Sequence, residues 1–364
     1  MIDLSKERFY GAKSEPIDSV EVASSRPMGD FEWQLLDVSH GGTVERYQVL
    51  VSDERDALAT EAGASAYLSA VSHLGEVHGE VGGVSARPMG AEQSNTSLIV
   101  DDAWVLKAFR RVERGINPDV ELLSRIADCP HVAGVRGYVT LDGATLAMQQ
   151  QLIVGGEDGF DLATGGNLGD AIELGAAIRV VHDALAQAFG TWEASGSDLR
   201  AGLESHLDEL VAAAPQLRSF EGRIRELYSA IPAGPHAIQR IHGDLHLGQT
   251  LKTVSAKEPR FYLIDFEGEP ARPLEQRRAP DHPLRDVAGM IRSLGYARAV
   301  GRLGDDWERS SVDALVRGYG SALPADDPVL AAYVVDKAAY EVVYEANNRP
   351  DWVDIPLAAI EGLV

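Results

Sequence analysis

The stretch IHGDLHLGQ at residues 241–249, followed by FYLIDFEGE at residues 261–269, decides the fold class of this chain. Asp244 is expected in a loop, Gln249 follows five positions later, and Asp265 ends an apolar run sixteen residues beyond Gln249. Carboxylate and amide oxygens are hard ligands that suit Mg²⁺ beside a phosphate. The alternative is two ordinary turns that carry surface acids. The occurrence of both motifs in this order favours a chemical site.

Phosphoryl transfer needs such a set of groups. Asp244 would orient and deprotonate an attacking hydroxyl, while Gln249 and Asp265 would hold Mg²⁺ against nucleotide phosphates. The spacing matches the D-x-x-x-x-N catalytic loop and the D-F-G metal site of protein kinases, with Gln for Asn and Asp-Phe-Glu for Asp-Phe-Gly. The sequence therefore predicts a kinase that depends on ATP and Mg²⁺.

An apolar strand earlier in the chain supplies a candidate for phosphate binding. Lys107 lies within AWVLKAF, where a lysine is costly unless an anion pairs with it. In a kinase such a strand lysine binds the α/β-phosphates and pairs with a helix glutamate, and Glu121 is the expected partner. The alternative is an edge-strand lysine whose charged end reaches solvent.

Two further segments are expected to contact the nucleotide. The polar turn GAEQSNTS at residues 90–97 offers Ser94, Asn95 and Thr96 as a phosphate loop, although a plain hairpin turn would have the same composition. Gln151 and Ile153 end the strand-rich block, where the adenine-binding hinge of a kinase would lie. Their residue types alone do not show this role.

The arrangement of predicted elements indicates an α+β fold with two lobes. Strand-like runs dominate before residue 154, with hairpin turns at Asp101–Asp102 and Asp142–Gly143. A helix is expected over residues 57–77. Helical periodicity dominates after residue 154, interrupted by the loop-and-strand segment at residues 240–270. A small β-rich lobe followed by a larger helical lobe fits this order.

Composition limits the classes of partner. A formal net charge of −23 disfavours nucleic acid and anionic membranes. No apolar run approaches the ~18 residues that a membrane span needs, and the first residues lack a signal-peptide core. The single cysteine, Cys129, fits a reducing compartment and a structural thiol. We therefore expect a cytoplasmic protein without nucleic-acid, membrane or obligatory protein partners.

The chain resembles the aminoglycoside phosphotransferase-like small-molecule kinases, in particular the actinobacterial maltokinase and glucosamine kinase group. The likeness is carried by the motifs above, by Lys107 with Glu121, and by GAEQSNTS, FRRVERGINPD, FEGEPARPLEQRR, HPLRDVAGMIRS and YEVVYEANNRPDW. The resemblance implies a protein-kinase-like fold with a cap subdomain at residues 1–88, the rest of the small lobe at residues 89–153, and a helical lobe at residues 154–364.

The resemblance also assigns roles to residues. It implies Asp244 as catalytic base, Gln249 and Asp265 as Mg²⁺ ligands, Lys107 as the ATP phosphate contact, and Glu121 as its positioning partner. Ser94, Asn95 and Thr96 would form the phosphate loop. Beside the base, His246 is expected to contact substrate, and a core role is favoured for His242.

The acceptor is expected to bind in the helical lobe. The helix YEVVYEANN places Glu341 and Glu345 four residues apart on one face, with Tyr344 and Asn348 on an adjacent face. Trp352 follows in the next loop, and aromatic faces with carboxylates suit a polyol or an ammonium. The alternative is a packed helix with solvated acids. Arg285–Asp286, at another helix start, are explained equally well by capping and dipole effects.

Within the kinase interpretation, glucosamine and maltose compete as acceptors. The acidic acceptor region and the length of the chain favour glucosamine, phosphorylated to glucosamine 6-phosphate, over maltose. An aminoglycoside is a third acceptor. A different class is a nucleotide-binding pseudokinase that regulates a partner. Retention of the base, the two metal ligands and the strand lysine argues against that class.

Overall fold

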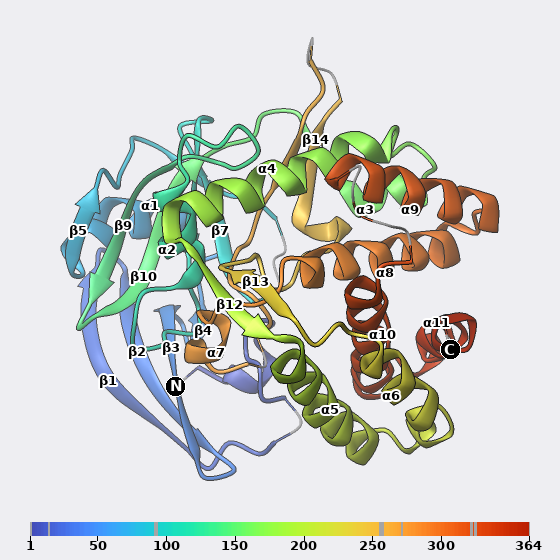
Figure 1. The fold of residues 1–364 in the computed structure, drawn as a ribbon. Coiled ribbons are helices and arrows are strands. Elements are labelled where there is room, and N and C mark those ends of the chain that lie inside the picture. The colour runs from blue at the N-terminus through green and yellow to red at the C-terminus, as the bar shows by residue number, and fades with distance from the viewer. Residues whose placement is uncertain are drawn as a thin grey trace. The chain divides into compact units, whose positions relative to one another are not determined.

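The computed structural model describes residues 2–13, 15–90, 94–254, 258–270, 272–320, 323 and 326–363. The chain divides into two compact units. Unit 1 comprises Met1–Ala127 and Ala133–Val154, and unit 2 comprises Asp128–Val132 and Gly155–Val364. Unit 1 is rich in strands and unit 2 is rich in helices, which confirms the α+β prediction (Figure 1).

Unit 1 contains an antiparallel four-stranded sheet near the start of the chain. Gly41 and Gly42 both take positive φ between the paired residues His40 and Thr43, where β2 turns into β3. Glycine takes such backbone angles at no steric cost, so this dipeptide suits a tight turn. The strands run in the order β1 (Ser19–Met28), β2 (Phe31–His40), β3 (Thr43–Ser52) and β4 (Arg55–Asp56).

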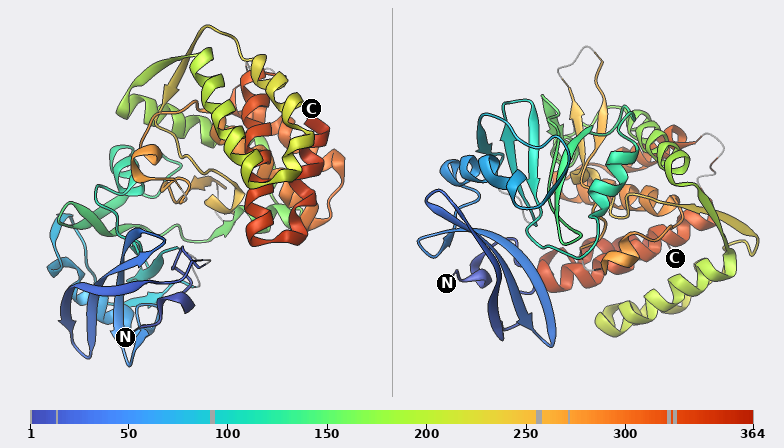
Figure 2. Two further views of the ribbon diagram at one scale, coloured as in Figure 1. Left: turned by 90° about the horizontal axis from the view of Figure 1, so that it is seen from below. Right: turned by 90° about the vertical axis from the view of Figure 1, so that its left-hand side faces the viewer.

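A six-stranded sheet forms the second layer of unit 1 (Figure 2). The predicted turns are confirmed, because Asp101, Asp102, Asp142 and Gly143 all take positive φ between antiparallel partners. Such angles tolerate aspartate and glycine better than most residues. The strands run in the order β5 (Glu76–Gly79), β9 (Val135–Leu141), β10 (Ala144–Gln151), β8 (Trp104–Ala108), β7 (Thr96–Val100) and β6 (Ala86–Pro88).

A buried glutamine links the two sheets of unit 1. Gln48 of β3 donates from Nε2 to the carbonyl oxygens of Phe109 and Leu146, at 2.6 Å each. Its Oε1 accepts hydrogen bonds from Trp33 and Tyr67. A buried amide whose hydrogen-bonding groups are all satisfied holds one relative position of its neighbours, whereas an unsatisfied amide would destabilise the core. Gln48 therefore fixes the four-stranded sheet against β10 and against the residue that follows β8, the strand that carries Lys107.

Two helices and two short 3₁₀ turns complete the part of unit 1 that the structure describes. The helix expected over residues 57–77 is shorter, because Thr60 caps α1 (Glu61–Ala70) by accepting a hydrogen bond from Gly63, and β5 already begins at Glu76. The 3₁₀ turns of this unit are η1 (Leu4–Lys6) and η2 (Val71–His73), and its second helix is α2 (Pro118–Arg125). The expected boundary between residues 1–88 and residues 89–153 falls within the six-stranded sheet. The edge strands β5 and β6 come before this boundary in the sequence, and the other four strands come after it.

Unit 2 is built mainly from helices, as the helical periodicity after residue 154 predicts. They are α3 (Gly159–Thr164), α4 (Ala171–Phe189), α5 (Gly196–Ala213), α6 (Glu221–Ser229), α7 (Leu274–Arg277), α8 (Leu284–Gly301), α9 (Asp305–Tyr319), α10 (Pro328–Asn348) and α11 (Asp354–Leu363). Short 3₁₀ turns lie between them at η3 (Pro215–Ser219), η4 (Leu247–Gln249) and η5 (Pro350–Trp352).

Two small sheets carry the loops between these helices. One has the order β11 (Gly156–Asp158), β14 (Thr250–Thr253), β15 (Phe261–Leu263), and the other pairs β12 (Thr191–Ser195) with β13 (Pro235–Gln239). The 241–249 motif therefore has a strand on each side of it in the sequence, β13 before it and β14 after it. This anchoring limits the freedom of the motif at its two ends.

Close helix packing supports these loops. A Cβ atom on Gly175 of α4 would come within 2.1 Å of the Leu315 carbonyl oxygen, and one on Gly318 of α9 within 2.1 Å of the Ile172 carbonyl oxygen. The backbones of α4 and α9 therefore approach more closely than a side chain would allow. A second pair, α8 and α10, lies side by side (Figures 1 and 2). Across the described residues, no helix is both long enough and apolar enough for a membrane span.

Candidate active site

The loop that carries Asp244 is held by its backbone. Asp286, in the first turn of α8, accepts the His242 N–H on Oδ2 at 2.8 Å and the Gly243 N–H on Oδ1 at 2.9 Å. His182 Nε2 lies 3.0 Å from Oδ2. Burial alone would raise the pKa of Asp286, but His182 and the loop N–H groups lower that pKa below its usual value. Asp286 is therefore a buried carboxylate that positions the loop, which is more than a helix cap.

The same face of α8 contacts the loop at two further points. A Cβ atom on Gly289 would come within 2.4 Å of the Leu245 carbonyl oxygen, so glycine leaves room for the loop backbone. Ser293 Oγ accepts the Leu247 N–H at 3.0 Å. Asp286, Gly289 and Ser293 follow one another at helical spacing on one face. The rigid helix therefore sets the path of the backbone on both sides of Asp244.

The carboxylate of Asp244 is half-buried and already has one partner. Lys337 Nζ, on α10, donates to its Oδ1 at 3.2 Å. Of the two neighbouring histidines, His242 is buried, with Nε2 2.9 Å from the Ile264 carbonyl oxygen and its ring centre 4.5 Å from that of Phe266 in a tilted arrangement. His246 is half-buried, and burial lowers its pKa below the usual value. A substrate role for His246 stays a prediction.

Gln249 and Asp265, the expected metal ligands, lie next to each other. Gln249 Nε2 is 3.1 Å from Asp265 Oδ2, and the Gln249 carbonyl accepts the Ile264 N–H at 3.0 Å. Pairing of β14 with β15 brings the two residues together although sixteen positions separate them. Asp265 has a φ of +64°, an uncommon value for a residue with a side chain. Such backbone strain is frequent at functional positions.

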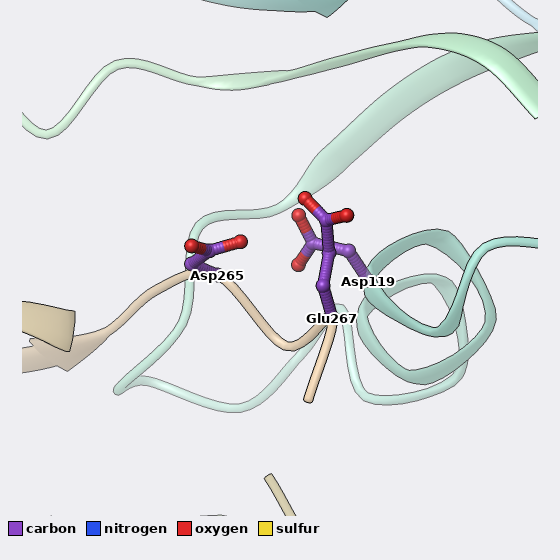
Figure 3. Close-up of side chains that lie close together, drawn as sticks. All are labelled: Asp119, Asp265 and Glu267. Carbon is purple, nitrogen blue, oxygen red and sulfur yellow. The ribbon is translucent and has the colours of Figure 1, made fainter. Parts of the chain in front are cut away.

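A second carboxylate lies on the loop after β15. Glu267 follows Asp265 by two residues, and carboxylate oxygens of the two residues lie within 4.8 Å of each other (Figure 3). Two carboxylates and one amide provide hard oxygen ligands for Mg²⁺. The donor set of unit 2 therefore fits this ion. The sequence motif contained Glu267 but gave no reason to select it as a ligand.

In unit 1, Lys107 has a buried acidic partner. Its Nζ lies 2.9 Å from Asp119 Oδ2, and both side chains are buried. Asp119 belongs to the first turn of α2, which begins after the capping residue Asn117. The requirement that Lys107 face an anion is thus met by Asp119, which the sequence analysis did not select. Glu121, two residues further along α2, is half-buried, and its positioning role stays a prediction.

The expected phosphate loop is described only in part, because residues 91–93 of GAEQSNTS lie outside the described residues. Ser94 is exposed, and Thr96 begins β7 opposite Ala108. Asn95 is buried, and its Oδ1 accepts the Arg110 N–H at 3.3 Å. Asn95 therefore holds the turn against the strand that carries Lys107. Phosphate binding by Ser94, Asn95 and Thr96 stays a prediction.

The two expected hinge residues lie at the end of β10, with Gln151 its last residue and Ile153 two positions beyond it. Gln151 is exposed, and its N–H donates to the Gly134 carbonyl at 2.9 Å. The next N–H, of Leu152, donates to Ala103 at 3.0 Å. Sheet hydrogen bonds thus occupy these two donors. An adenine contact would have to use the Gln151 carbonyl or the Ile153 N–H, and it stays a prediction.

The two acids predicted on α10 have different surroundings. Glu341 Oε2 accepts a hydrogen bond from Arg292 Nε at 2.9 Å. The other oxygen of Glu341, Oε1, has no hydrogen-bond partner among the described residues. Burial raises the pKa of Glu341. Glu345 is 1 % exposed, with Oε1 3.0 Å from Tyr296 Oη and Oε2 2.8 Å from Arg349 Nε. Glu345 therefore supports the helix end, and nothing in these contacts favours its role as a substrate ligand.

Aromatic residues continue along α10 to the following loop. Tyr344 is 43 % exposed and stacks with Tyr340 at 6.3 Å. The guanidinium of Arg349 lies 4.3 Å from the centre of the Trp352 ring, and Asn348 Nδ2 donates to the Tyr344 carbonyl at 2.8 Å. Tyr344 thus offers an accessible ring, whereas Asn348 and Trp352 have structural partners. Substrate contacts by these three residues stay predictions.

The geometry defines a class of enzyme. In unit 2, Asp244 lies on a loop braced by α8, and its Oδ2 has no hydrogen-bond partner among the described residues. The amide of Gln249 and the carboxylates of Asp265 and Glu267 come later in the same unit. In unit 1, a buried lysine lies on a strand. These are the parts that a phosphotransferase of the kinase-like fold requires.

Comparison with known proteins agrees with this class. The model of the phosphotransferase enzyme family, APH, matches residues 85–331, and the chain belongs to this family. A glucosamine kinase of Streptacidiphilus jiangxiensis is 28% identical over 321 residues, which cover 75% of this chain and 72% of that protein. A glucosamine kinase of Mycolicibacterium smegmatis (strain ATCC 700084 / mc(2)155) is 27% identical over 321 residues, covering 76% and 79%.

A solved structure extends the likeness to the fold. A glucosamine kinase in complex with glucosamine, ADP and inorganic phosphate superposes with a TM-score of 0.71 at 21% identity, covering 95% of this chain and 94% of that one. The predicted kinase-like fold and the predicted family are confirmed. The protein is a phosphotransferase.

Proposed function

We propose that this phosphotransferase is a sugar kinase that transfers the γ-phosphoryl group of ATP to a hydroxyl of glucosamine, giving glucosamine 6-phosphate. Two relatives at 27–28% identity are glucosamine kinases. The observation that carries the proposal is the position of Asp244, whose loop is fixed by Asp286, together with the contact between Gln249 and Asp265. This arrangement supports one base for a hydroxyl and one oxygen-rich site for a metal–nucleotide complex.

The proposed reaction is a direct transfer. The acceptor hydroxyl donates to the Asp244 oxygen that Lys337 does not occupy, and the new O–P bond forms as the bond between the γ-phosphorus and the ADP oxygen breaks. The hydroxyl proton passes to Asp244, and ADP leaves with the electron pair of the broken bond. Gln249 and Asp265, with Glu267, would hold Mg²⁺, which when bound neutralises phosphate charge. Lys107 would contact the α/β-phosphates.

Acceptor selectivity is assigned to Glu341. A buried carboxylate whose pKa is raised by burial gains from a cation, and Arg292 occupies only one of its oxygens. An ammonium group at the other oxygen would add a charge-assisted hydrogen bond. Glucosamine carries such a group, whereas maltose does not. The face of Tyr344 offers an apolar surface for a sugar ring.

The proposal is tested by ADP release from the purified full chain with Mg²⁺–ATP and four acceptors: glucosamine, glucose, maltose and an aminoglycoside. We expect turnover with glucosamine, and a Asp244→Asn variant should lose ~10²–10⁴-fold in kcat while Mg²⁺–ADP still raises Tm. Preference for maltose would identify the alternative maltokinase. Nucleotide binding without turnover of any acceptor would overturn the proposal in favour of a regulatory pseudokinase.

A further inference from the structure

We propose that Lys337 is a positioning residue that orients the base Asp244, an inference that rests on the proposed sugar-kinase function. Lys337 is on α10, and 93 positions separate it from Asp244. Its Nζ donates to Asp244 Oδ1 at 3.2 Å and to Glu269 Oε1 at 3.0 Å. Lys337 thus ties the base to the acid that ends the FYLIDFEGE segment. The sequence analysis assigned no role to either Lys337 or Glu269.

The contacts of Lys337 favour positioning over ligand binding. An ammonium has three N–H donors, and two of them reach Asp244 and Glu269. The Nζ atom also lies 4.7 Å from the centre of the Tyr340 ring, within the range of a cation–π contact. The side chain of Lys337 is 20% exposed. Carboxylates therefore already hold two of the three donors of a mostly buried ammonium, which favours an orienting role for Lys337 over a ligand-binding one.

Glu269 is itself held firmly. Its carboxylate lies 2.6 Å from Arg272 Nε and 2.9 Å from Arg285 Nη2, and it is 5 % exposed. Arg285 continues to Asp281 at 2.8 Å. Lys337, Arg272 and Arg285 thus place three cations against this one buried carboxylate, and charge-assisted hydrogen bonds of this kind favour its ionised form. Glu269 is therefore an ionised anchor that keeps Lys337 in place.

The chain of ion pairs is balanced in charge. Three carboxylates, on Asp244, Glu269 and Asp281, face three cations, on Lys337, Arg272 and Arg285. Burial disfavours the ammonium of Lys337, but Glu269 and Asp244 raise its pKa above the usual value. Lys337 therefore keeps its charge throughout the pH range of an assay. Without this charge, Glu269 would keep only its two arginine partners, Arg272 and Arg285, and Asp244 would lose the donor that orients it.

The orientation of Asp244 matters because phosphoryl transfer depends mainly on positioning and electrostatics. With Oδ1 bound by Lys337, the carboxylate cannot turn freely, and Oδ2 is the oxygen that remains for the acceptor hydroxyl. A displacement of about 1 Å in a reacting group can cost ~10²-fold in rate. Loss of Lys337 should therefore lower kcat and leave the nucleotide contacts unchanged.

The test compares Lys337→Met, Lys337→Arg and Lys337→Ala in the full chain, with Lys252→Met as the matched control. Lys252 is another mostly buried lysine, which donates to the Leu168 carbonyl at 2.9 Å. We expect Lys337→Met to lower kcat by ~10–100-fold with the KM for ATP and the Tm increase by Mg²⁺–ADP unchanged. Lys337→Arg should retain part of kcat, and Lys252→Met should retain kcat in the folded fraction.

Chemical rescue gives the decisive readout. Ethylammonium or propylammonium should restore part of the activity of Lys337→Ala, because the small cation can occupy the vacated space beside Asp244. The same amines should not activate the wild type or Asp244→Asn. Unchanged kcat in Lys337→Met overturns the positioning role. So does a loss of kcat that merely follows a loss of folding and nucleotide binding without rescue. Absence of wild-type turnover with every sugar overturns the proposed function as well, so the two failures are distinguishable.

Discussion

Asp286 accepts the backbone N–H of His242 at 2.8 Å, two residues before the proposed base. A second N–H, of Gly243, reaches the other oxygen of the same carboxylate at 2.9 Å. Each oxygen therefore has its own donor, and the carboxylate is 1 % exposed. The catalytic loop thus depends on a helix that begins more than forty residues later.

Asp286→Asn should disturb this loop, because the amide NH₂ would face one of the two backbone N–H donors. Hydrogen bonds to a charged group contribute ~1.5–3 kcal/mol each, so we expect the free energy of unfolding to fall by ~2–4 kcal/mol and kcat to fall with it. Urea denaturation and ADP release measure the two effects. Asp305→Asn, an exposed acid in the first turn of α9, is the control and should change stability by less than ~0.5 kcal/mol. Equal stability of the two variants would contradict this role of Asp286.

Asp265→Asn should change metal dependence more than fold. Asparagine tolerates the left-handed backbone of Asp265 but lacks the negative charge. We therefore expect a near-normal Tm without ligand, a much higher Mg²⁺ concentration for half-maximal rate, and a smaller Tm increase with Mg²⁺–ADP. Glu267→Gln should show the same pattern to a smaller degree if Glu267 shares the ion. A normal Mg²⁺ requirement in Asp265→Asn would exclude this carboxylate as a ligand.

Glu341→Gln and Glu345→Gln should separate an acceptor contact from a structural one. Glu341→Gln is expected to lower kcat/KM for glucosamine at least ~10-fold more than kcat/KM for glucose, which lacks the ammonium; tenfold corresponds to ~1.4 kcal/mol. Glu345→Gln weakens contacts with Arg349 and Tyr296, so it should lower Tm and affect both sugars equally. Equal effects of Glu341→Gln on both sugars would refute the ammonium contact.

His282 should make stability sensitive to acid. Its Nδ1 accepts the Leu284 N–H at 3.2 Å, and burial lowers the pKa of His282 to about 4. The folded state therefore binds the proton less readily than the unfolded state, whose pKa is ~6.5. Protonation of His282 therefore lowers the free energy of unfolding. The loss is absent above pH ~6.5, grows as the pH falls, and levels off below about 4. The shift sets an upper bound of ~3 kcal/mol, reduced by partial exposure.

The measurement compares the free energy of unfolding of the wild type and His282→Asn between pH 7 and pH 4.5. Asparagine can still accept from the Leu284 N–H but does not titrate in this range. The variant should therefore lose less stability than the wild type on acidification, while both behave alike above pH 7. Parallel curves over the whole range would show that protonation of His282 makes no contribution.

Local patterns predicted the elements that act over a few residues. The turns at Asp101–Asp102 and Asp142–Gly143 and the long helix α10 all follow from turn chemistry and periodicity. The end of α1 did not follow, because residues 57–77 were taken together as one Ala/Leu-rich helix, whereas β5 takes the last part of that segment into a sheet. Strand pairing with a distant segment overrode a weak helix preference there.

The candidate site shows the same division. Sequence reasoning selected Asp244, Gln249 and Asp265 as site residues because their spacing forms a local motif. It did not select Lys337 or Glu269. Sequence reasoning selected Glu121 on α2 as the partner of Lys107 and did not select Asp119, whose Oδ2 lies 2.9 Å from the lysine Nζ. Two acids on α2 differ by only two positions, and the phase of a short helix is not fixed by its sequence alone. Burial and pairing of Glu345 likewise required the packed partner helix α8.

The sequence by itself determined the order of Asp244, Gln249 and Asp265, the lysine in an apolar strand, and the periodicity of the helices. Each of these features depends on neighbouring residues and backbone geometry. Packing alone decided which charges meet: Asp286 with the loop, Lys337 with Asp244 and Glu269, and Arg292 with Glu341. The interaction between two charges depends on their separation and on how much water they lose. Neither quantity exists until distant helices have come together.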